Sequence, residues 1–290
     1  AMSLLWLARS VVSSHASFSA SRRVLATVAG AKYDFLLVDV NNGVATITLK
    51  DDKKRNALSS GMMAELRDTI GSFEENKAVK AVVIRNDGKV FSSGHDLREL
   101  HTTQNVKGTT EPIFQLCSSL MLKIRNARFP VIAEVAGLAT AGGCQLVAQC
   151  DLAIASENST FATPGVNIGL FCTTPGVALG RAVPAKAAMH MLLTAQQMTA
   201  PEALRMGLLS QVVPADKLRE TGRAVAEGIA RAPAETVAIG KKAFYQQMSM
   251  PSLADAYSFG QRVMADNMGR PDAKEGIDAF IGKREPRWVS

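Results

Sequence analysis

Residues 131–151, VIAEVAGLATAGGCQLVAQCD, decide the fold of this chain. They open with a five-residue run, VIAEV, that is rich in β-branched residues and apolar except for Glu134. This run lies between Pro130 and Gly137 and predicts a strand. A turn of small residues follows, then a short segment with apolar residues at helical spacing, and a second apolar run begins at Leu152. The order strand, turn, helix, strand is the unit of a largely parallel α/β sheet with right-handed crossovers.

Gly142 and Gly143 lie where the helix of this unit should begin. The first N–H groups of a helix have no partner inside it and carry partial positive charge. Glycine lets an acceptor approach such groups closely, so the turn suits an anion or a polarised carbonyl oxygen. The same glycines also suit a tight strand-to-helix turn with no ligand, and this stretch alone leaves both interpretations open.

Strands and helices alternate on both sides of the opening stretch. Asn41-Asn42-Gly43 predicts a hairpin between strands at residues 35–40 and 44–49, and Ser59 predicts a helix cap. Further strands are expected at residues 79–85 and 211–213, and the turn-rich residues 157–176 predict a segment that is mostly loop. Helices are expected at residues 59–75, from Leu97, at 113–126, 185–194, 201–206, 217–231, 234–248, 253–268 and 271–283.

Composition excludes several classes of protein. With 290 residues and 47% hydrophobic content the chain can bury a full core, and no apolar run is long enough to predict a membrane helix. Four cysteines without a C-x-x-C pair indicate neither a zinc site nor a disulfide framework. The net charge of +7 suits an acidic ligand, a nucleic acid or solubility alone.

Residues 1–33 differ in amino-acid composition from the rest of the chain. They hold seven serines and three arginines and no acidic residue. An arginine- and serine-rich, acid-poor leader predicts a mitochondrial transit peptide, and the alternative is an unstructured tail.

A second glycine turn, Ser93-Gly94-His95, follows the strand at residues 79–85. Neither glycine turn is a G-x-G-x-x-G or a Walker loop, so dinucleotide binding and nucleotide hydrolysis fit poorly. Because ligand sites gather at the carboxyl ends of parallel strands, backbone donors from the two turns could converge on one oxygen.

Four segments carry a resemblance to the crotonase, or enoyl-CoA hydratase/isomerase, superfamily over about residues 35–286. They are KRNAL at 54–58, FSSGHD at 91–96, residues 130–151 and EGIDAF at 275–280, in the family's order. The resemblance implies an α/β spiral of β-β-α turns at residues 34–200 and a C-terminal helical trimerisation region at 201–290. It also implies a homotrimer or a hexamer (a dimer of trimers), placed in the mitochondrial matrix and acting in fatty-acid metabolism.

The resemblance further implies a coenzyme A thioester as ligand, with no other cofactor and no metal. It places the thioester oxygen between the backbone N–H groups of His95 and Gly142, which would form an oxyanion hole. The residues that it places against coenzyme A, from this subunit or a neighbouring one, are Arg55, Ala57, Leu58, Ser93, His95, Asp96, Leu97, Phe280 and Lys283.

The chain departs from the family at the two catalytic glutamates of the hydratases, whose positions are Gln145 and Gly165. General acid–base catalysis requires a group that exchanges a proton near the working pH, and neither residue has one. We therefore expect ordinary enoyl-CoA hydration to be weak or absent. The imidazole of His95 could also face the acyl group. Asp96 and Asp151 suit local caps or turns, and strand alternation should turn Glu134 away from the ligand side of the glycine turn. Cys172 suits a buried, inert thiol.

Three function classes remain from this reasoning. The first is an acyl-CoA enzyme that relies on the oxyanion hole, for decarboxylation, thioester hydrolysis or limited hydration. The second is a non-catalytic acyl-CoA-binding or regulatory protein. RNA binding is disfavoured, because residues 59–75 mix Arg67 with several acidic residues and do not form a positive face.

Overall fold

The structure is a computed structural model that describes residues 33–104 and 106–290. The predicted leader lies outside the described residues except for Tyr33, so the transit-peptide interpretation stays a prediction. Within the described ranges, no helix is both long and apolar enough to cross a membrane.

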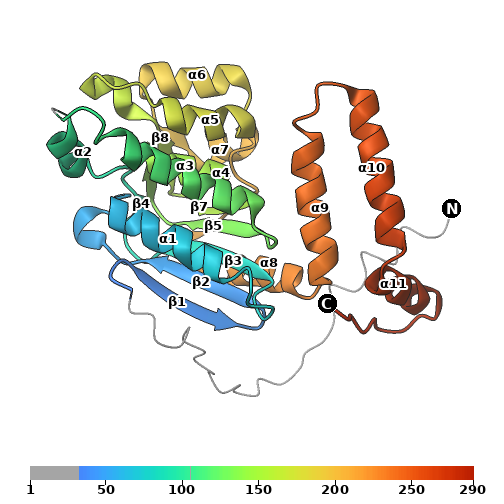
Figure 1. The fold of residues 1–290 in the computed structure, drawn as a ribbon. Coiled ribbons are helices and arrows are strands. Elements are labelled where there is room, and N and C mark those ends of the chain that lie inside the picture. The colour runs from blue at the N-terminus through green and yellow to red at the C-terminus, as the bar shows by residue number, and fades with distance from the viewer. Residues whose placement is uncertain (1–32, 105) are drawn as a thin grey trace.

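One sheet of six strands forms the base of the fold (Figure 1). Its order is β1 (Leu36–Asn41), β2 (Val44–Leu49), β3 (Ala81–Asn86), β5 (Val131–Val135), β7 (Leu152–Ser156) and β10 (Gln211–Val213). β1 and β2 form the predicted antiparallel hairpin, with Asn42 and Gly43 both at positive φ, and every other neighbouring pair is parallel.

A second, four-stranded sheet was not predicted. It contains β4 (Val90–Ser92), β6 (Leu138–Thr140), β8 (Thr160–Ala162) and β9 (Met198–Thr199), of which the first three are parallel. The expectation of loop at residues 157–176 is therefore wrong in part, because β8, a 3-10 helix at Pro164–Ile168 and the start of α5 lie there. Strands of two or three residues are too short to show a period of two, so no local pattern predicts them.

The two sheets are joined by a repeating β-β-α turn, which confirms the implied spiral. In β3–β4, β5–β6 and β7–β8 the first strand belongs to the large sheet and the second to the small one. Each pair is followed by helix: α2 (Leu97–Thr103) and α3 (Glu111–Asn126), then α4 (Gly142–Gln149), then α5 (Thr173–Ala182). The carboxyl ends of β4, β6 and β8 are consequently brought side by side.

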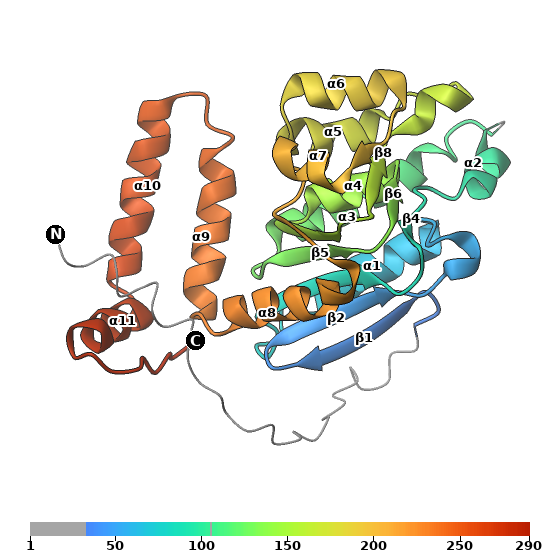
Figure 2. The same ribbon diagram turned by 180° about the vertical axis from the view of Figure 1, so that it is seen from behind.

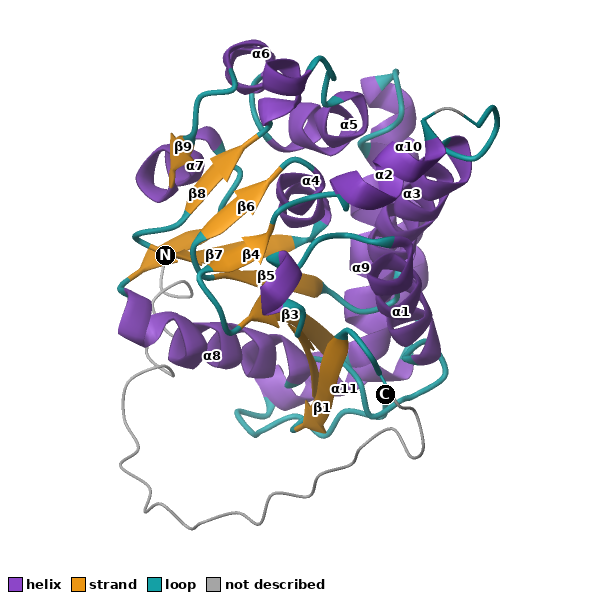
Figure 3. Cartoon of the chain, turned by 90° about the vertical axis from the view of Figure 1, so that its left-hand side faces the viewer, coloured by secondary structure: helices purple, strands orange, loops and turns teal. Residues whose placement is uncertain are grey.

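Helices cover both faces of the large sheet (Figure 3), and the side chains of its strands alternate between two buried clusters. Val82 and Ile84 of β3 join the main core with α1 (Ser60–Ser72), α3 and α4. Ala81 and Val83 of the same strand pack with α8 (Leu218–Ala230) on the opposite face. α1 begins after Ser59, whose side chain accepts a hydrogen bond from the Met62 amide as predicted. α6 (Ala185–Thr194) and α7 (Ala200–Met206) complete the far end of the spiral.

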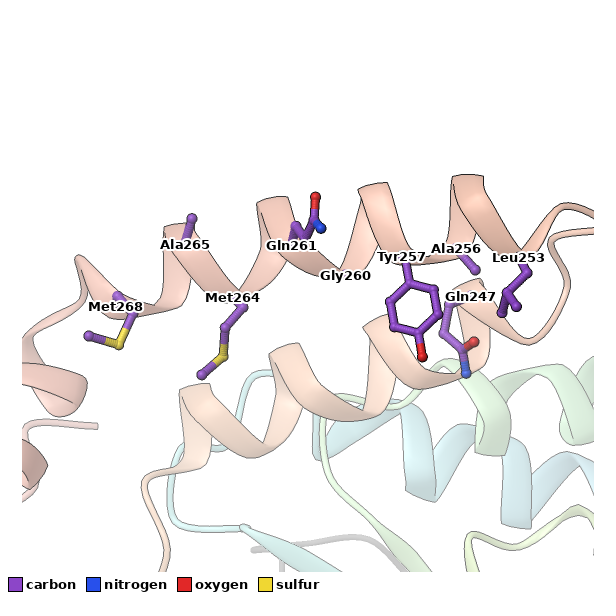
Figure 4. Close-up of a pocket in the computed structure, with 9 residues that line it drawn as sticks. All are labelled: Gln247, Leu253, Ala256, Tyr257, Gly260, Gln261, Met264, Ala265 and Met268. Atoms are coloured by element: carbon purple, nitrogen blue, oxygen red, sulfur yellow. The ribbon is translucent and has the colours of Figure 1, made fainter.

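The last three helices extend from the core (Figures 1 and 2). α9 (Ala234–Gln247) and α10 (Leu253–Met268) form a hairpin, and α11 (Pro271–Ile281) crosses its base. No residue of α9 or α10 is fully buried within the described chain, and a hollow of about 760 Å³ runs along them, lined chiefly by Leu253, Tyr257, Met264 and Met268 (Figure 4). β10 and α8, although they follow residue 200, pack with the spiral and not with this hairpin.

Candidate functional site

The loops that follow β4, β6 and β8 meet at one edge of the small sheet. Register pairs Ser92 with Ala139 and Thr140 with Ala162, so the three strands end together. The loops begin with Ser93-Gly94-His95, Ala141-Gly142-Gly143 and Thr163-Pro164-Gly165. Residues that are up to 72 positions apart in sequence therefore share the carboxyl edge of one parallel sheet, which is where ligand sites gather.

The first two glycine turns lie in direct contact. A Cβ added to Gly94 would lie 2.8 Å from the Cβ of Ala141 and 2.9 Å from the amide nitrogen of Gly142. Gly94 also has a φ of +83°, a conformation that side chains rarely adopt. A residue larger than glycine at position 94 would separate the two turns, so their convergence depends on it.

Two backbone amides at this contact are available to a ligand. Gly142 is the first residue of α4, where N–H groups have no partner within the helix, and the preceding Ala141 provides no side-chain cap. Among the described residues, the amide of Gly142 and that of His95 donate no hydrogen bond. Both amides belong to the two glycine turns that were predicted to converge. Their role as an oxyanion hole stays a prediction.

The imidazole of His95 lies beside the same contact. Its ring meets that of Phe114, on α3, edge to face at a centroid distance of 5.1 Å, and its Cδ2 is 3.6 Å from where a Cβ of Gly142 would lie. Both ring nitrogens are buried and make no hydrogen bond of normal geometry in the described chain, although the Leu58 backbone lies near enough to the ring to act as a weak partner. Burial lowers the pKa of His95, which the backbone of Leu58 and the charge of Glu99 oppose only in part.

Gln145 lies one helical turn after Gly142 and is buried. Its Oε1 lies 3.8 Å from the Sγ of Cys117, which donates to it from α3. Burial raises the pKa of Cys117 to about 12, so this thiol is protonated at neutral pH. The position thus carries a neutral amide bonded to a neutral thiol.

Gly165 has no room for a side chain in this arrangement. A Cβ would lie 2.7 Å from the carbonyl oxygen of Leu170 and 2.8 Å from the Sγ of Cys172. A glutamate at position 165 would require the segment around residues 170–172 to move. Burial raises the pKa of Cys172, and a hydrogen bond with the backbone of Gly165 opposes this, which agrees with the inert thiol expected from the sequence.

Three carboxylates were considered as substitutes for the missing glutamates, and each of them is hydrogen-bonded or paired within the fold. Asp96 caps α2 through the Arg98 amide and pairs with Lys54 at 3.2 Å. Asp151 accepts from the Val131 amide, Lys241 and Tyr245. Glu134 is buried against Arg219 of α8, on the sheet face opposite α4. None of these carboxylates replaces a missing glutamate.

The segments predicted to bind coenzyme A are joined by backbone hydrogen bonds. The Ser93 amide donates to the Arg55 carbonyl at 3.0 Å, and the Leu58 amide donates to the Gly94 carbonyl at 2.8 Å. Arg55 and Leu97 are exposed beside this junction, whereas Ala57 and Leu58 are buried. Phe280 and Lys283 are not brought here, because α11 and the turn after it lie on the other side of the chain from α2 (Figures 1 and 2).

Two threonine hydroxyls at this edge were not predicted from the sequence. The Oγ1 atoms of Thr140, the last residue of β6, and Thr163, directly after β8, are buried without a partner among the described residues. Together with the two His95 nitrogens, they are four of the seven buried side-chain atoms in residues 33–104 and 106–290 that lack a hydrogen bond of normal geometry. Buried polar groups are normally satisfied, so this concentration marks a place where a ligand or water completes the bonding. The threonines are visible only once the short strands are placed.

No cluster of three or more histidine, cysteine or acidic side chains in the described ranges could hold a metal ion. The donors at the edge of the small sheet are backbone amides, hydroxyls and one imidazole. Such a set suits an organic ligand with an oxygen acceptor.

Comparison with known proteins gives consistent matches over most of the chain. The model of the family described as enoyl-CoA hydratase/isomerase matches residues 39–290. The mitochondrial enoyl-CoA hydratase domain-containing protein 3 of Rattus norvegicus is 50% identical over 247 residues, which is 85% of this chain and 82% of the relative.

Two solved structures extend the match to the fold. The crystal structure of human enoyl coenzyme A hydratase domain-containing protein 3 has a TM-score of 0.85 at 47% identity, covering 88% of this chain and 100% of that one. An enoyl-CoA hydratase of Mycobacterium smegmatis has a TM-score of 0.85 at 43% identity, covering 88% and 99%.

Proposed function

The chain belongs to the enoyl-CoA hydratase/isomerase family, and from this premise we propose that it binds an acyl-CoA and holds the thioester oxygen between the amides of His95 and Gly142. The observation that carries the proposal is the contact of the two glycine turns, which leaves both amides without a protein acceptor. Preorganised donors of this kind stabilise an enolate or tetrahedral oxyanion by about 3 kcal/mol each.

Ordinary hydration of an enoyl-CoA is not part of this proposal. Adding water across a double bond needs groups that hold the water and move its protons. Gln145 carries an amide and Gly165 has no space for a side chain. The same two observations support the second candidate, a non-catalytic acyl-CoA-binding or regulatory protein. Decarboxylation and thioester hydrolysis are the catalytic alternatives that use the oxyanion hole.

The proposal includes a homotrimer, or a hexamer made of two trimers. Phe244, Met248, Leu253, Tyr257 and Met264 on the C-terminal hairpin are each more than half exposed in the single chain. An exposed apolar surface of this kind marks a contact with another protein. A neighbouring subunit would also be the source of Phe280 and Lys283, which the fold of one chain keeps away from the site (Figure 1).

We place the protein in the mitochondrial matrix, in fatty-acid metabolism. The support is that the relatives with about half of their residues identical are named mitochondrial. The leader at residues 1–33 agrees with this placement.

The test compares butyryl-CoA with S-butyl-CoA, a thioether that lacks the carbonyl oxygen, by titration calorimetry. We expect the purified protein to bind the thioester about fivefold more tightly, which corresponds to one hydrogen-bonded oxygen. Gly142→Pro removes one donor at the first position of a helix, where proline is best tolerated, and should reduce this preference. Ala185→Pro is the matched control, because it changes the exposed first residue of α6.

Two results would count against the proposal. Equal affinity of the unchanged protein for the two compounds would remove the thioester oxygen from the binding mode. Rapid hydration of crotonyl-CoA that is lost in Gly142→Pro would show that the missing carboxylates do not disable that step.

A further inference from the structure

The side chain of His95 is unusual because both of its ring nitrogens are buried and neither makes a hydrogen bond of normal geometry in the described chain, although the Leu58 backbone lies near the ring and raises its pKa. An imidazole carries a donor and an acceptor when neutral, and leaving both unsatisfied costs free energy. Edge-to-face packing on Phe114 fixes the ring without using either nitrogen. The arrangement leaves the ring nitrogen that does not face the Leu58 backbone without any partner in the described chain, and this nitrogen can accept a hydrogen bond or a proton from a ligand.

The ring is positioned within reach of the acyl group that the two amides would hold. The amide and the imidazole belong to the same residue, and the ring packs on Phe114 with its Cδ2 3.6 Å from where a Cβ of Gly142 would lie. An oxygen bonded to both amides places its carbonyl carbon, and the next carbon C2, within a few bond lengths of the His95 side chain. Proton transfer requires this proximity first and a suitable pKa second.

The other titratable groups near the amides are protonated thiols or carboxylates that already have partners in the fold. Burial raises the pKa values of Cys117 on α3 and of Cys144 on α4 to about 12. Glu99 on α2 accepts a hydrogen bond from the Ser60 amide, and Asp96 is occupied by its cap and by Lys54.

Resting on the proposed acyl-CoA function, we propose that the His95 imidazole removes and returns a proton at C2 of the bound thioester. The C2–H bond breaks, its proton passes to a ring nitrogen, and its electron pair forms the enolate, whose oxygen lies between the two amides. Return of the proton from the imidazolium to C2 restores the thioester. No oxidant, reductant or second substrate is required, and the reaction class is enolate chemistry rather than hydration.

This step has a definite dependence on pH. Only the neutral imidazole accepts a proton, and burial lowers the pKa of His95 below its ordinary value of 6.5. The charge of Glu99 acts in the opposite direction, while Cys117 and Cys144 are neutral. The rate should therefore rise with pH below 6.5 and be flat above it.

The experiment follows the exchange of C2 hydrogens of butyryl-CoA in D₂O by mass spectrometry, with butyryl-CoA binding measured on the same samples. We expect exchange by the unchanged protein and a loss of about 10²-fold or more in His95→Gln, which keeps the backbone amide. His101→Gln, an exposed histidine on α2, is the matched control and should exchange normally. Free imidazole should restore exchange in His95→Ala.

The outcomes separate the two proposals. Binding of butyryl-CoA without exchange by the unchanged protein overturns the role of His95 and leaves acyl-CoA binding in place. Unchanged exchange in His95→Gln also overturns it. Failure of the unchanged protein to bind any CoA thioester overturns both.

Discussion

Replacing Lys241 by methionine removes the buried cation that fastens α9 to the core. Its Nζ donates to the carbonyls of Ile124 and Phe129 at 2.9 Å each and to Asp151 at 2.7 Å. The side chains of Lys241 and Asp151 are only 7% and 11% exposed. Burial lowers the pKa of Lys241, so desolvation offsets much of the attraction between the two charges.

The cost of losing one partner is nevertheless large. Breaking a buried ion pair on one side costs about 3–5 kcal/mol, because the other charge stays buried. Asp151 keeps hydrogen bonds from Tyr245 and from the Val131 amide, so we expect the lower end, about 3 kcal/mol. The carbonyls of Ile124 and Phe129 lose their donor as well, so the loss in the free energy of unfolding should not be smaller than this.

Urea unfolding followed by circular dichroism, at one protein concentration, measures this loss. Lys242→Met on the next, exposed position is the matched control and should change stability by less than about 0.5 kcal/mol. The double variant Lys241→Met with Asp151→Asn should lose less than the sum of the single changes. An unchanged urea midpoint in Lys241→Met would show that this contact does not hold α9 against the core.

Three further changes test the packing and the electrostatics of the site. Gly143→Ala should destabilise the fold by about 1–3 kcal/mol in thermal unfolding, because its Cβ would lie 2.4 Å from the carbonyl oxygen of Ser92. Gly180→Ala is the control and should not destabilise the fold, because its Cβ would meet nothing within 4 Å. Gln145→Glu should leave crotonyl-CoA unhydrated in an absorbance assay, since Gly165 still supplies no second carboxyl; rapid hydration would contradict this. The folded protein holds the pKa of His95 below 6.5, so the unfolded chain binds more protons there and stability should fall as the pH drops through and below 6.5. His95→Gln should show a smaller fall between pH 7.5 and 5.5 in urea unfolding, and an equal fall would argue against the shift.

The long and regular parts of this fold were predictable from the sequence. The apolar spacing of residues 253–268 gave α10 with its observed ends, and the run at residues 131–135 gave β5. In both, the pattern is local and is repeated within the element. The small sheet could not be predicted in this way, since β4, β6 and β8 each have three residues and are defined by partners more than twenty residues away.

The candidate site likewise has a part that the sequence predicts and a part that it does not. Glycine at positions 94 and 142 signalled two turns, and the parallel order of the strands predicted that such turns meet. The unpartnered hydroxyls of Thr140 and Thr163 had no such signal, because a threonine after a short strand looks the same whether its hydroxyl is bonded or free. Burial and hydrogen bonding are properties of the assembled fold.

The contact between Gly94 and Gly142 has a consequence for how this protein can change over evolutionary time. The two amides beside it belong to the main chain, so most mutations alter the reactive side chains around them and leave the donors intact. Under the proposed function, a lineage that loses its acidic side chains keeps both donors for the thioester oxygen. Binding of the thioester is then separable from the side chains that determine which reaction follows.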